Sequence, residues 1–416
     1  MNTTEIDQAV VSHEVYADDA RMRAVFAELR REDPVHWTEP AGYPPFWTIS
    51  RHADVCEIGK RSDVFITEAL CVESYDEQRR VLEETGGTGK YSRMMIHMNG
   101  LDHRGHRGIT QTWFMPKNLQ RVEPMVNTLA ARAVDEMLGH GGRCEFVMDV
   151  AVWYPLRLIM LLLGVPEADH PRLLTLTQQI VAPNDPSLQR DTKSYKGPAV
   201  KEMMEFFARV HEDRIANPRD DLASVIANSA IDGHPIGRME ALSYYIILST
   251  AGHDTTSSTL SGGLLALLRH PDELARLRAD PSLLPLAVDE MLRWVTPVRH
   301  FMRTATQDVE IGGRKIAAGD RLLLSYPSAN FDEAVFDEPH RFKIDRSPNR
   351  HVAFGFGVHA CLGQNLSRME LRAFFAELLP RIGEIALDGE PSFIQTTLVG
   401  GLKSLPLRYA PARLAA

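Results

Sequence analysis

Apolar residues recur at the spacing of an amphipathic helix over much of this chain. The period dominates residues 116–269 and also marks residues 20–31 and 364–382. Residues 238–269 form a very long run, and its centre is apolar on nearly all sides, which indicates burial. As one helix at 1.5 Å per residue, this run would extend roughly 45–50 Å. We therefore predict a long buried helix that crosses the molecule.

A smaller set of segments has the composition of strands. Residues 45–50 combine aromatic and β-branched side chains, and a short helix is predicted after them at residues 53–60. Residues 309–316 are typical of short strands joined by a turn at Gly312 and Gly313. The pattern predicts a mainly α fold with a small β component, and we expect one domain over residues 1–416.

Two polar segments interrupt this pattern. Residues 72–92 are charged and contain three glycines, and we predict a long irregular loop there. Residues 181–200 contain three prolines and a glycine between helical segments. Such segments suit a lid that closes over a pocket, with plain surface connections as the alternative.

The charge balance excludes one class of partner. The chain has 46 Lys and Arg against 55 Asp and Glu, for a net charge of −9. This balance argues against binding to nucleic acid, whose phosphates require a basic surface. The apolar residues 158–165 fall far short of the roughly 20 needed to span a bilayer, and the polar N-terminus does not resemble a signal peptide. We expect a cytoplasmic protein that does not bind membranes.

Three of the four cysteines are expected to be buried apolar side chains. Cys56, Cys71 and Cys144 have apolar neighbours, and their spacing indicates neither a disulfide framework nor a metal site. So few cysteines in so long a chain favour a reducing compartment.

The fourth cysteine, Cys361, lies in the sequence FGFGVHACLG at residues 354–363, directly before a predicted helix. A helix N-terminus favours the thiolate form of a thiol. Gly357 and Gly363 would let the backbone approach a flat ligand closely. The alternative for such a residue alone is a core thiol beside a glycine turn.

Residues 250–256, TAGHDTT, are unusual for the centre of a buried helix. Gly252 weakens a helix by about 1 kcal/mol relative to alanine. Thr255 and Thr256 can bond back to the preceding turn, and burial of Asp254 is costly. A helix that tolerates all of these is expected to open locally for a ligand.

The residues around Cys361 resemble the FxxGxxxCxG haem-binding loop of the cytochrome P450 family. The resemblance extends from about residue 16 to residue 409. It implies the P450 fold, with the long central helix over one haem b per chain. Cys361 would be the thiolate ligand of the iron, with Phe354 and Gly355 in the same loop against the cofactor.

The resemblance assigns further roles. Asp254 and Thr255 match the acid–alcohol pair of the family, in which Thr255 would hold a water or the bound oxygen and Asp254 would relay protons from solvent. Glu290 and Arg293, with Arg346, match a buried Glu-Arg-Arg triad that shapes the haem loop without taking part in the chemistry.

Cations or donors for the haem propionates are implied at four positions. Arg303 and His359 match family positions, and His103 and Arg107 match a His-x-x-x-Arg pattern on one helix face. The family often has Asp-Pro-Pro before this histidine, whereas this chain has residues 99–101, Asn-Gly-Leu, which places the role of His103 in doubt.

Several stretches resemble the α-terpineol hydroxylase branch of the family: AGHDTTSS (251–258), FMRTA (301–305), LSYPSAN (324–330) and PNRH (348–351). Relatives in this branch oxidise small terpenoids or alkyl aromatics such as p-cymene. By position, the implied pocket residues are Ile247, Ala251, Val298, Thr397, Leu398 and Val399.

The expected reaction is hydroxylation of a small hydrophobic substrate with O₂. Electrons would come from a separate ferredoxin with its NADH-dependent reductase, because no GxGxxG fingerprint follows a predicted strand. A basic docking face is predicted, with scattered solvated charges as the alternative, at Arg104, Lys117, Arg121, Arg346 and Arg350.

Two other functions remain open at this point. A peroxide-driven haem oxygenase would share the cysteine loop, although the Asp254–Thr255 pair argues against it. A non-catalytic haem sensor is the second alternative, and coupled NADH consumption with ferredoxin present would exclude it. The sequence leaves open the exact substrate, the carbon hydroxylated, the particular redox partner and the oligomeric state.

Overall fold

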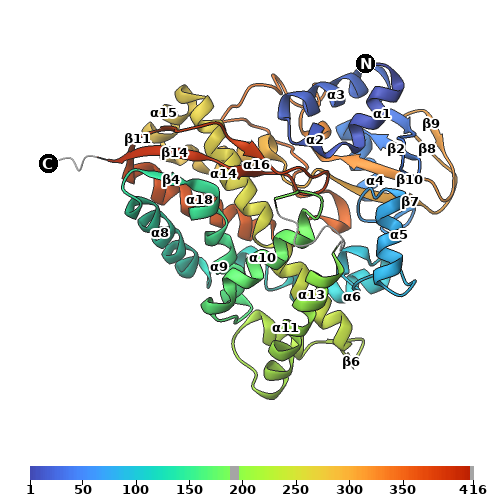
Figure 1. Ribbon diagram of the computed structural model, residues 1–416, viewed down its shortest axis with the longest axis horizontal. Helices are drawn as coiled ribbons and strands as arrows, with labels where there is room; N and C mark the ends of the chain where they lie inside the picture. The colour runs from blue at the N-terminus through green and yellow to red at the C-terminus, as the bar shows by residue number, and fades with distance from the viewer. Residues whose placement is uncertain (188–195, 413–416) are drawn as a thin grey trace.

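The computed structural model describes residues 1–187 and 196–412. Helices and sheet separate in space: Figure 1 shows the N-terminal helices beside the larger sheet at one side and the helix-rich part at the other. The helices are α1 (Thr3–Val11), α2 (His13–Tyr16), α3 (Asp19–Glu32), α4 (His52–Lys60), α5 (Tyr75–Glu84), α6 (Gly100–Gln111), α7 (Pro116–Leu119), α8 (Glu123–Gly139), α9 (Trp153–Leu162), α10 (His170–Val181), α11 (Gly197–Ala216), α12 (Leu222–Ala227), α13 (Arg238–Ala251), α14 (Asp254–Arg269), α15 (Pro271–Ala279), α16 (Leu284–Val295), α17 (Tyr326–Asn330) and α18 (Gln364–Arg381).

The strands form two main sheets. The larger has the order β1 (Val35–Thr38), β2 (Phe46–Ile49), β10 (Arg321–Ser325), β7 (His300–Ala305) and β3 (Phe65–Ile66), with β2 and β10 parallel. The second has the order β11 (Ile382–Leu387), β14 (Pro406–Pro411) and β4 (Arg143–Glu145). Three two-stranded pairs complete the set: β5 (Ala230–Ile231) with β6 (His234–Pro235), β8 (Val309–Ile311) with β9 (Arg314–Ile316), and β12 (Ser392–Phe393) with β13 (Leu402–Ser404).

The mainly α fold with a small β component is confirmed, as are the helices predicted at residues 20–31, 53–60 and 364–382 and the strands at residues 45–50 and 309–316. The prediction of an irregular loop over residues 72–92 is wrong, because α5 lies within it. Ser74 and Glu77 form a capping box, in which each side chain accepts a backbone N–H of the other residue. This local pairing starts a helix despite the charged composition.

Residues 238–269 do not form one helix. The structure divides them into α13 and α14, with Gly252 and His253 between. Of the other predicted interruption, residues 181–200, residues 188–195 lie outside the described residues, and α11 begins at Gly197 within its last part.

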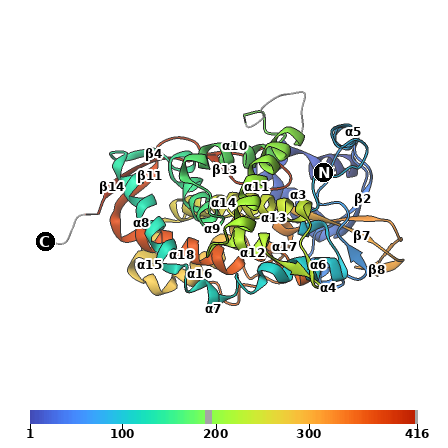
Figure 2. The same cartoon turned by 90° about the horizontal axis from the view of Figure 1, so that it is seen from below.

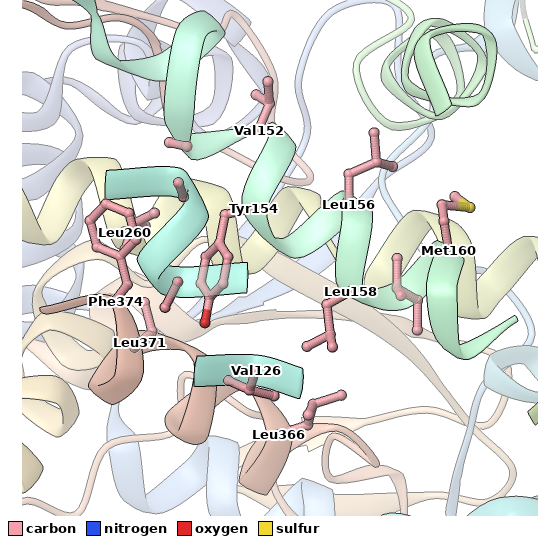
Figure 3. Close-up of a cluster of buried hydrophobic side chains, with 14 of the residues drawn as sticks. Val126, Val152, Tyr154, Leu156, Leu158, Met160, Leu260, Leu366, Leu371 and Phe374 are labelled. Carbon is pink, nitrogen blue, oxygen red and sulfur yellow. The ribbon is translucent and has the colours of Figure 1, made fainter. Parts of the chain in front are cut away.

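The main core lies between α8, α9, α14, α16 and α18. Figure 3 shows Tyr154 of α9 beside Phe374 of α18, and their ring centroids are 5.6 Å apart. Seen from below in Figure 2, α9 and α14 lie between α10 above and α16 and α18 beneath. Burying one such large apolar side chain stabilises the fold by roughly 1.5–3 kcal/mol, so this core holds α14 and α18 in fixed relation.

Gly263 allows α14 to pack closely on α16. A Cβ atom at this position would lie 2.8 Å from the sulfur of Met291, well inside van der Waals contact. The close approach positions α16, which carries Glu290 and Arg293, directly behind α14.

Candidate active site

An internal cavity collects residues that are far apart in sequence. It encloses an empty volume of about 1270 Å³, part of it open to solvent. Its walls come from α6, α13, α14, residues 297–301 and the segment around Cys361. Most of the lining is apolar, including Met95, Ile96, Phe114, Ile159, Leu248, Leu292, Pro297, Phe301 and Leu366. Such walls exclude water and favour an apolar ligand.

The loop before α18 presents Cys361 to this cavity. The backbone N–H of Cys361 donates to the carbonyl of Phe354 (2.8 Å), which closes the loop. Gly355 and Gly357 have φ values of +70° and +77°, a region that favours glycine. A Cβ at Gly357 would lie 1.8 Å from the carbonyl oxygen of Gly59, so glycine also permits the loop to dock on α4.

The Cys361 thiol is open to the cavity but removed from bulk water. This desolvation raises its pKa above the ordinary value of a thiol. The N–H of Gly363 and the guanidinium groups of Arg107 and Arg368 oppose the shift without cancelling it. The helix N-terminus therefore does not produce a thiolate by itself, whereas coordination to a metal ion deprotonates a thiol outright.

Glu290 lies at the centre of a fully buried ionic cluster. Its two carboxylate oxygens accept from Nε and Nη2 of Arg293 (both 2.8 Å), and Oε2 accepts from Nε of Arg346 (3.0 Å). The backbone N–H of Lys343 and the amide of Asn349 also donate to it, at 3.1 and 3.2 Å. The structure thus brings all three predicted residues together with every carboxylate oxygen paired.

A chain of hydrogen bonds joins this cluster to the cysteine loop. Arg293 donates to the carbonyl of Asn330 (2.8 Å), and the Asn330 side chain accepts from the N–H of Val352 (2.7 Å). The carbonyl of Val352 then accepts from the N–H of Gly355 (2.9 Å). Asn330 was not singled out in the sequence, since nothing in its local pattern signals a contact with residues 22 positions away.

Of the four predicted propionate partners, His103, Arg107 and His359 line the cavity. The rings of His103 and His359 lie 4.2 Å apart between centroids. Burial, followed by the charge of Arg107, lowers the pKa of His103 to about 4, and burial together with His103 and the nearby arginines lowers that of His359 to about 3. Both rings are therefore neutral donors near pH 7, and the positive charge here belongs to Arg107 and Arg303.

Arg303 is buried next to these groups. Nη1 of its guanidinium donates to the carbonyl of Met302 (2.7 Å). Its charge acts on both His359 and Tyr326, which line the cavity. A buried cation of this kind suits an anionic group on the ligand.

The break between α13 and α14 lies on the cavity wall. His253 has φ −121° and ψ −46°, outside the helical range. A Cβ at Gly252 would lie 2.5 Å from the carbonyl of Leu248 and 2.8 Å from Ile159, so only glycine fits without movement. The side-chain hydroxyl of Thr255 donates to the carbonyl of Ala251 across the break (3.0 Å). Glycine thus permits Ile159 of α9 to pack closely against the break, and the Thr255 hydroxyl bridges it.

The two residues of the predicted acid–alcohol pair face different spaces. Thr255 lines the large cavity together with Cys361. Asp254 lines a second cavity, bordered also by Gln178, Ser257 and Lys403. His253, which directly precedes Asp254 and had no role assigned from the sequence, contacts Asp254, with 3.1 Å between Nε2 and Oδ1. The sequence feature that could have indicated a role for His253 is an ionisable side chain in a mostly apolar helical segment.

The predicted pocket residues fall into two groups. Ile247, Ala251 and Val298 line the large cavity. Thr397, Leu398 and Val399 are not among its lining residues; Leu398 accepts the N–H of Arg299 (2.8 Å) and Val399 pairs with Val298. Leu398 and Val399 therefore pair with the wall segment 297–299, and Val399 also lines the second cavity.

One member of the predicted docking face is corrected. Arg346 is 6% exposed, because it is paired with Glu290, and so it cannot contribute to a surface. The remaining members are exposed: Arg104, Lys117, Arg121 and Arg350. Of the other cysteines, Cys56 is buried and Cys71 and Cys144 are half-buried.

Comparison with known proteins identifies the family. Residues 166–383 match the family model Cytochrome P450. Cytochrome P450-terp of a Pseudomonas species is 39% identical over 98% of this chain and 98% of its own. Methyl-branched lipid omega-hydroxylase of Mycobacterium tuberculosis is 34% identical, covering 94% of this chain and 92% of its own. The solved structure of CYP108D1 from Novosphingobium aromaticivorans has a TM-score of 0.92 at 40% identity, covering 98% and 99% of the two chains.

The chain belongs to the cytochrome P450 family. It is therefore a monooxygenase of the haem-thiolate class, which uses O₂, an organic substrate and redox partners. The predicted family, fold and cofactor are confirmed. No helix in residues 1–187 and 196–412 has the length and apolarity needed to cross a membrane.

The residues present fit a haem. A thiol that opens into an apolar cavity is the donor that this cofactor class requires. A Cβ at Gly363, on the same wall, would meet no atom within 4 Å, so glycine leaves space beside the thiol. Arg107 and Arg303 supply positive charge beside His359 at the cavity wall, which suits the anionic propionates of a haem.

Proposed function

We propose that this enzyme hydroxylates a small hydrophobic compound, a monoterpenoid or alkyl aromatic such as α-terpineol or p-cymene. The observation that carries this proposal is that Cys361 and Thr255 open into the same predominantly apolar cavity. The name of Cytochrome P450-terp and a solved relative from Mycobacterium marinum in complex with pseudoionone support the substrate class. The overall reaction consumes O₂, two electrons and two protons and gives an alcohol and water.

In this proposal the thiolate of Cys361 would hold the haem iron. When bound, the haem supplies the activation of O₂, and the thiolate favours cleavage of the O–O bond. The hydrogen-bond chain from Glu290 through Asn330 and Val352 holds the cysteine loop in shape. Arg107 and Arg303, with the rings of His103 and His359, would bind the propionates.

The residues of α13 and α14 hold the substrate and deliver protons. Ile247, Ala251 and Val298 contact the substrate and exclude water. Asp254 receives protons from the side of the second cavity, and the hydroxyl of Thr255 passes them on at its oxygen. Proton transfer from a positioned group contributes typically 10²–10⁴-fold to a rate.

Electrons are proposed to come from a ferredoxin and an NADH-dependent reductase. Exposed Arg104, Lys117, Arg121 and Arg350 support a docking surface for an acidic partner. The test is NADH oxidation with a bacterial ferredoxin system over a range of ionic strength. Charge reversal at Lys117 and Arg350 should raise the KM for ferredoxin several-fold, whereas reversal at Arg238, exposed on α13, serves as the control and should not.

The substrate class is tested by visible titration of the ferric holoprotein with α-terpineol and p-cymene, with a long-chain fatty acid as the control. A saturable shift from low to high spin with a small ligand supports the proposal and selects the compound for turnover. A shift with the fatty acid alone would overturn the substrate class and leave the haem-thiolate assignment intact.

A further inference from the structure

His253 is fully buried at the break between α13 and α14 and is held by three side-chain contacts. Its Nδ1 lies 2.8 Å from the carbonyl oxygen of Ser249. Its Nε2 lies 3.1 Å from Oδ1 of Asp254 and 3.2 Å from the hydroxyl of Thr177 on α10. The ring therefore joins α10, α13 and α14 at the site where the acid of the acid–alcohol pair begins α14.

These contacts restrict where protons can be. A carbonyl oxygen can only accept, so Nδ1 of His253 carries a proton. The Thr177 hydroxyl donates to the carbonyl of Leu174 at 3.0 Å, so its oxygen is left to accept from Nε2 of His253 at 3.2 Å. A proton on Nε2 satisfies this contact, and the resulting imidazolium lies 3.1 Å from Oδ1 of Asp254, where the opposite charges attract. The favoured arrangement is therefore an imidazolium beside a carboxylate.

The pKa of His253 agrees with this placement of the protons. Burial lowers the pKa of His253, but the charge of Asp254, its hydrogen bond and the Ser249 carbonyl together raise it above the ordinary value of histidine. A buried histidine without such a partner behaves differently: burial lowers the pKa of His300 to about 4.

The charged groups on neighbouring elements are engaged elsewhere. Lys403 on β13 is paired with Asp185 at 3.3 Å, and Arg157 on α9 is paired with Glu136 at 2.6 Å. Asp149, in the turn packed on α14, accepts the N–H of Glu145 at 2.8 Å. Burial in α18 raises the pKa of Glu370 well above the ordinary carboxyl value. Nε2 of His253 instead contacts the Thr177 hydroxyl and Oδ1 of Asp254.

Asp254 borders the second cavity, whose wall is mostly apolar. Four residues of this wall carry polar groups that can bind water: Gln178, Ser257, Ser258 and Lys403. Oδ1 of Asp254 faces His253, whereas Oδ2 is buried and has no hydrogen-bond partner among the described residues. A proton that enters from the second cavity would therefore reach the carboxyl group through water held by these side chains.

We propose that His253 and Asp254 share one proton and act as a two-residue donor, in which His253 is a positioning residue that keeps Asp254 loaded with a transferable proton. The inference rests on the proposed function of Asp254 and Thr255 as the proton relay. The proton leaves toward Thr255 and is replaced from the second cavity.

The first test measures the proton without turnover. The holoprotein is labelled with ¹⁵N at histidine and held as its diamagnetic ferrous carbon monoxide complex, so that nitrogen NMR reports the protonation of the ring. The carboxyl stretch of Asp254 is recorded as the infrared difference between the wild type and Asp254→Asn. At pH 7 we expect either a protonated Nε2 of His253 or a protonated Asp254, unchanged from pH 6 to 8.5. A neutral ring with an unprotonated Nε2 beside an ionised Asp254 would overturn the proposal.

The second test uses His253→Gln, whose amide can still donate to Asp254 but carries no ionisable proton. We expect at least a threefold rise in peroxide released per NADH, increasing with pH, whereas the wild type stays flat. His211→Gln is the matched control, because His211 is also buried and its Nδ1 faces the hydroxyl of Tyr245 (3.3 Å), away from Asp254. A wild-type peroxide fraction in His253→Gln across the pH range would contradict the inference.

The two tests separate this inference from the proposed function. If no substrate is hydroxylated at all, the proposed function fails while the spectroscopic measurement still decides whether the proton is shared. If His253→Gln does not fold, the wild type and Asp254→Asn suffice for that measurement.

Discussion

Two carboxylates, the fully buried Glu290 and the half-buried Asp254, show opposite ways of accommodating a negative charge in the same molecule. Glu290 is surrounded by two guanidinium groups and two N–H donors, and both of its oxygens are paired. Asp254 has one imidazole partner, an unpartnered oxygen and a broken helix beside it. The first arrangement is complete and rigid; the second leaves a group free to exchange a proton.

The difference follows from what each site must do. A buried ion pair costs desolvation energy and is stable only when its remaining hydrogen bonds are satisfied. A fully satisfied network fixes one geometry, which suits the support of the cysteine loop. Incomplete pairing at Asp254 is unfavourable for folding, and such departures from good packing are concentrated at functional sites. We therefore assign a structural role to Glu290 and a chemical one to Asp254.

The largest effect is expected at Cys361, the residue that the Glu290 cluster supports. Cys361→Ala should abolish hydroxylation and the thiolate-type spectrum with carbon monoxide, because no other thiol lines the cavity among the described residues. Optical spectroscopy of the reduced protein with carbon monoxide checks this. A retained thiolate-type spectrum would refute the ligand assignment.

Glu290→Ala tests the structural side of the comparison. It would leave Arg293 and Arg346 buried without a counter-charge, at a cost of about 3–5 kcal/mol. We expect little folded holoprotein, measured by haem content and thermal unfolding. Glu273→Ala is the control, since this carboxylate pairs with Arg276, which is half exposed. Normal haem content in Glu290→Ala would contradict the structural role of Glu290 and so its contrast with Asp254.

Thr255→Ala tests the chemical side. The protein should fold and bind haem, because Thr255 contributes one hydrogen bond to the Ala251 carbonyl. Product formed per NADH should fall by roughly an order of magnitude and peroxide should rise, in line with the loss of a proton-transfer group. Thr259→Ala, which removes a similar hydroxyl-to-carbonyl bond one turn later, is the comparison variant. Unchanged coupling in Thr255→Ala would mean that this region has no chemical role.

The smallest effect is expected for Gly252→Ala, which tests the packing around the break between α13 and α14. The added methyl would press on Leu248 and Ile159, an overpacking cost of about 1–2 kcal/mol after the gain in helix propensity. Thermal unfolding should show this loss. Gly108→Ala in α6, where a Cβ meets nothing within 4 Å, should be neutral or stabilising. Equal stability of the two variants would contradict the close packing at Gly252.

Local patterns predicted much of the fold, with two instructive failures. The periodicity located α3, α4 and α18, because their apolar residues follow the helical repeat. Helix α5 was missed because its composition suggested a loop, although Ser74 and Glu77 had the spacing of a capping box. Arg346 was assigned both to the buried triad and to the surface, and only its contact with Glu290 decides between them.

The sequence by itself determined the family, the haem-thiolate class and the residue types for the chemistry, because these lie in short motifs whose spacing is local. Only the tertiary structure decided that residues 238–269 break at Gly252, that Thr255 and Asp254 face different cavities, and that His253 contacts Asp254. These features depend on the close packing of Ile159 of α9 against Gly252 and on the hydroxyl of Thr177 of α10. Contacts between residues about 75 to 95 positions apart leave no periodic trace in the chain, since they exist only once the helices have packed.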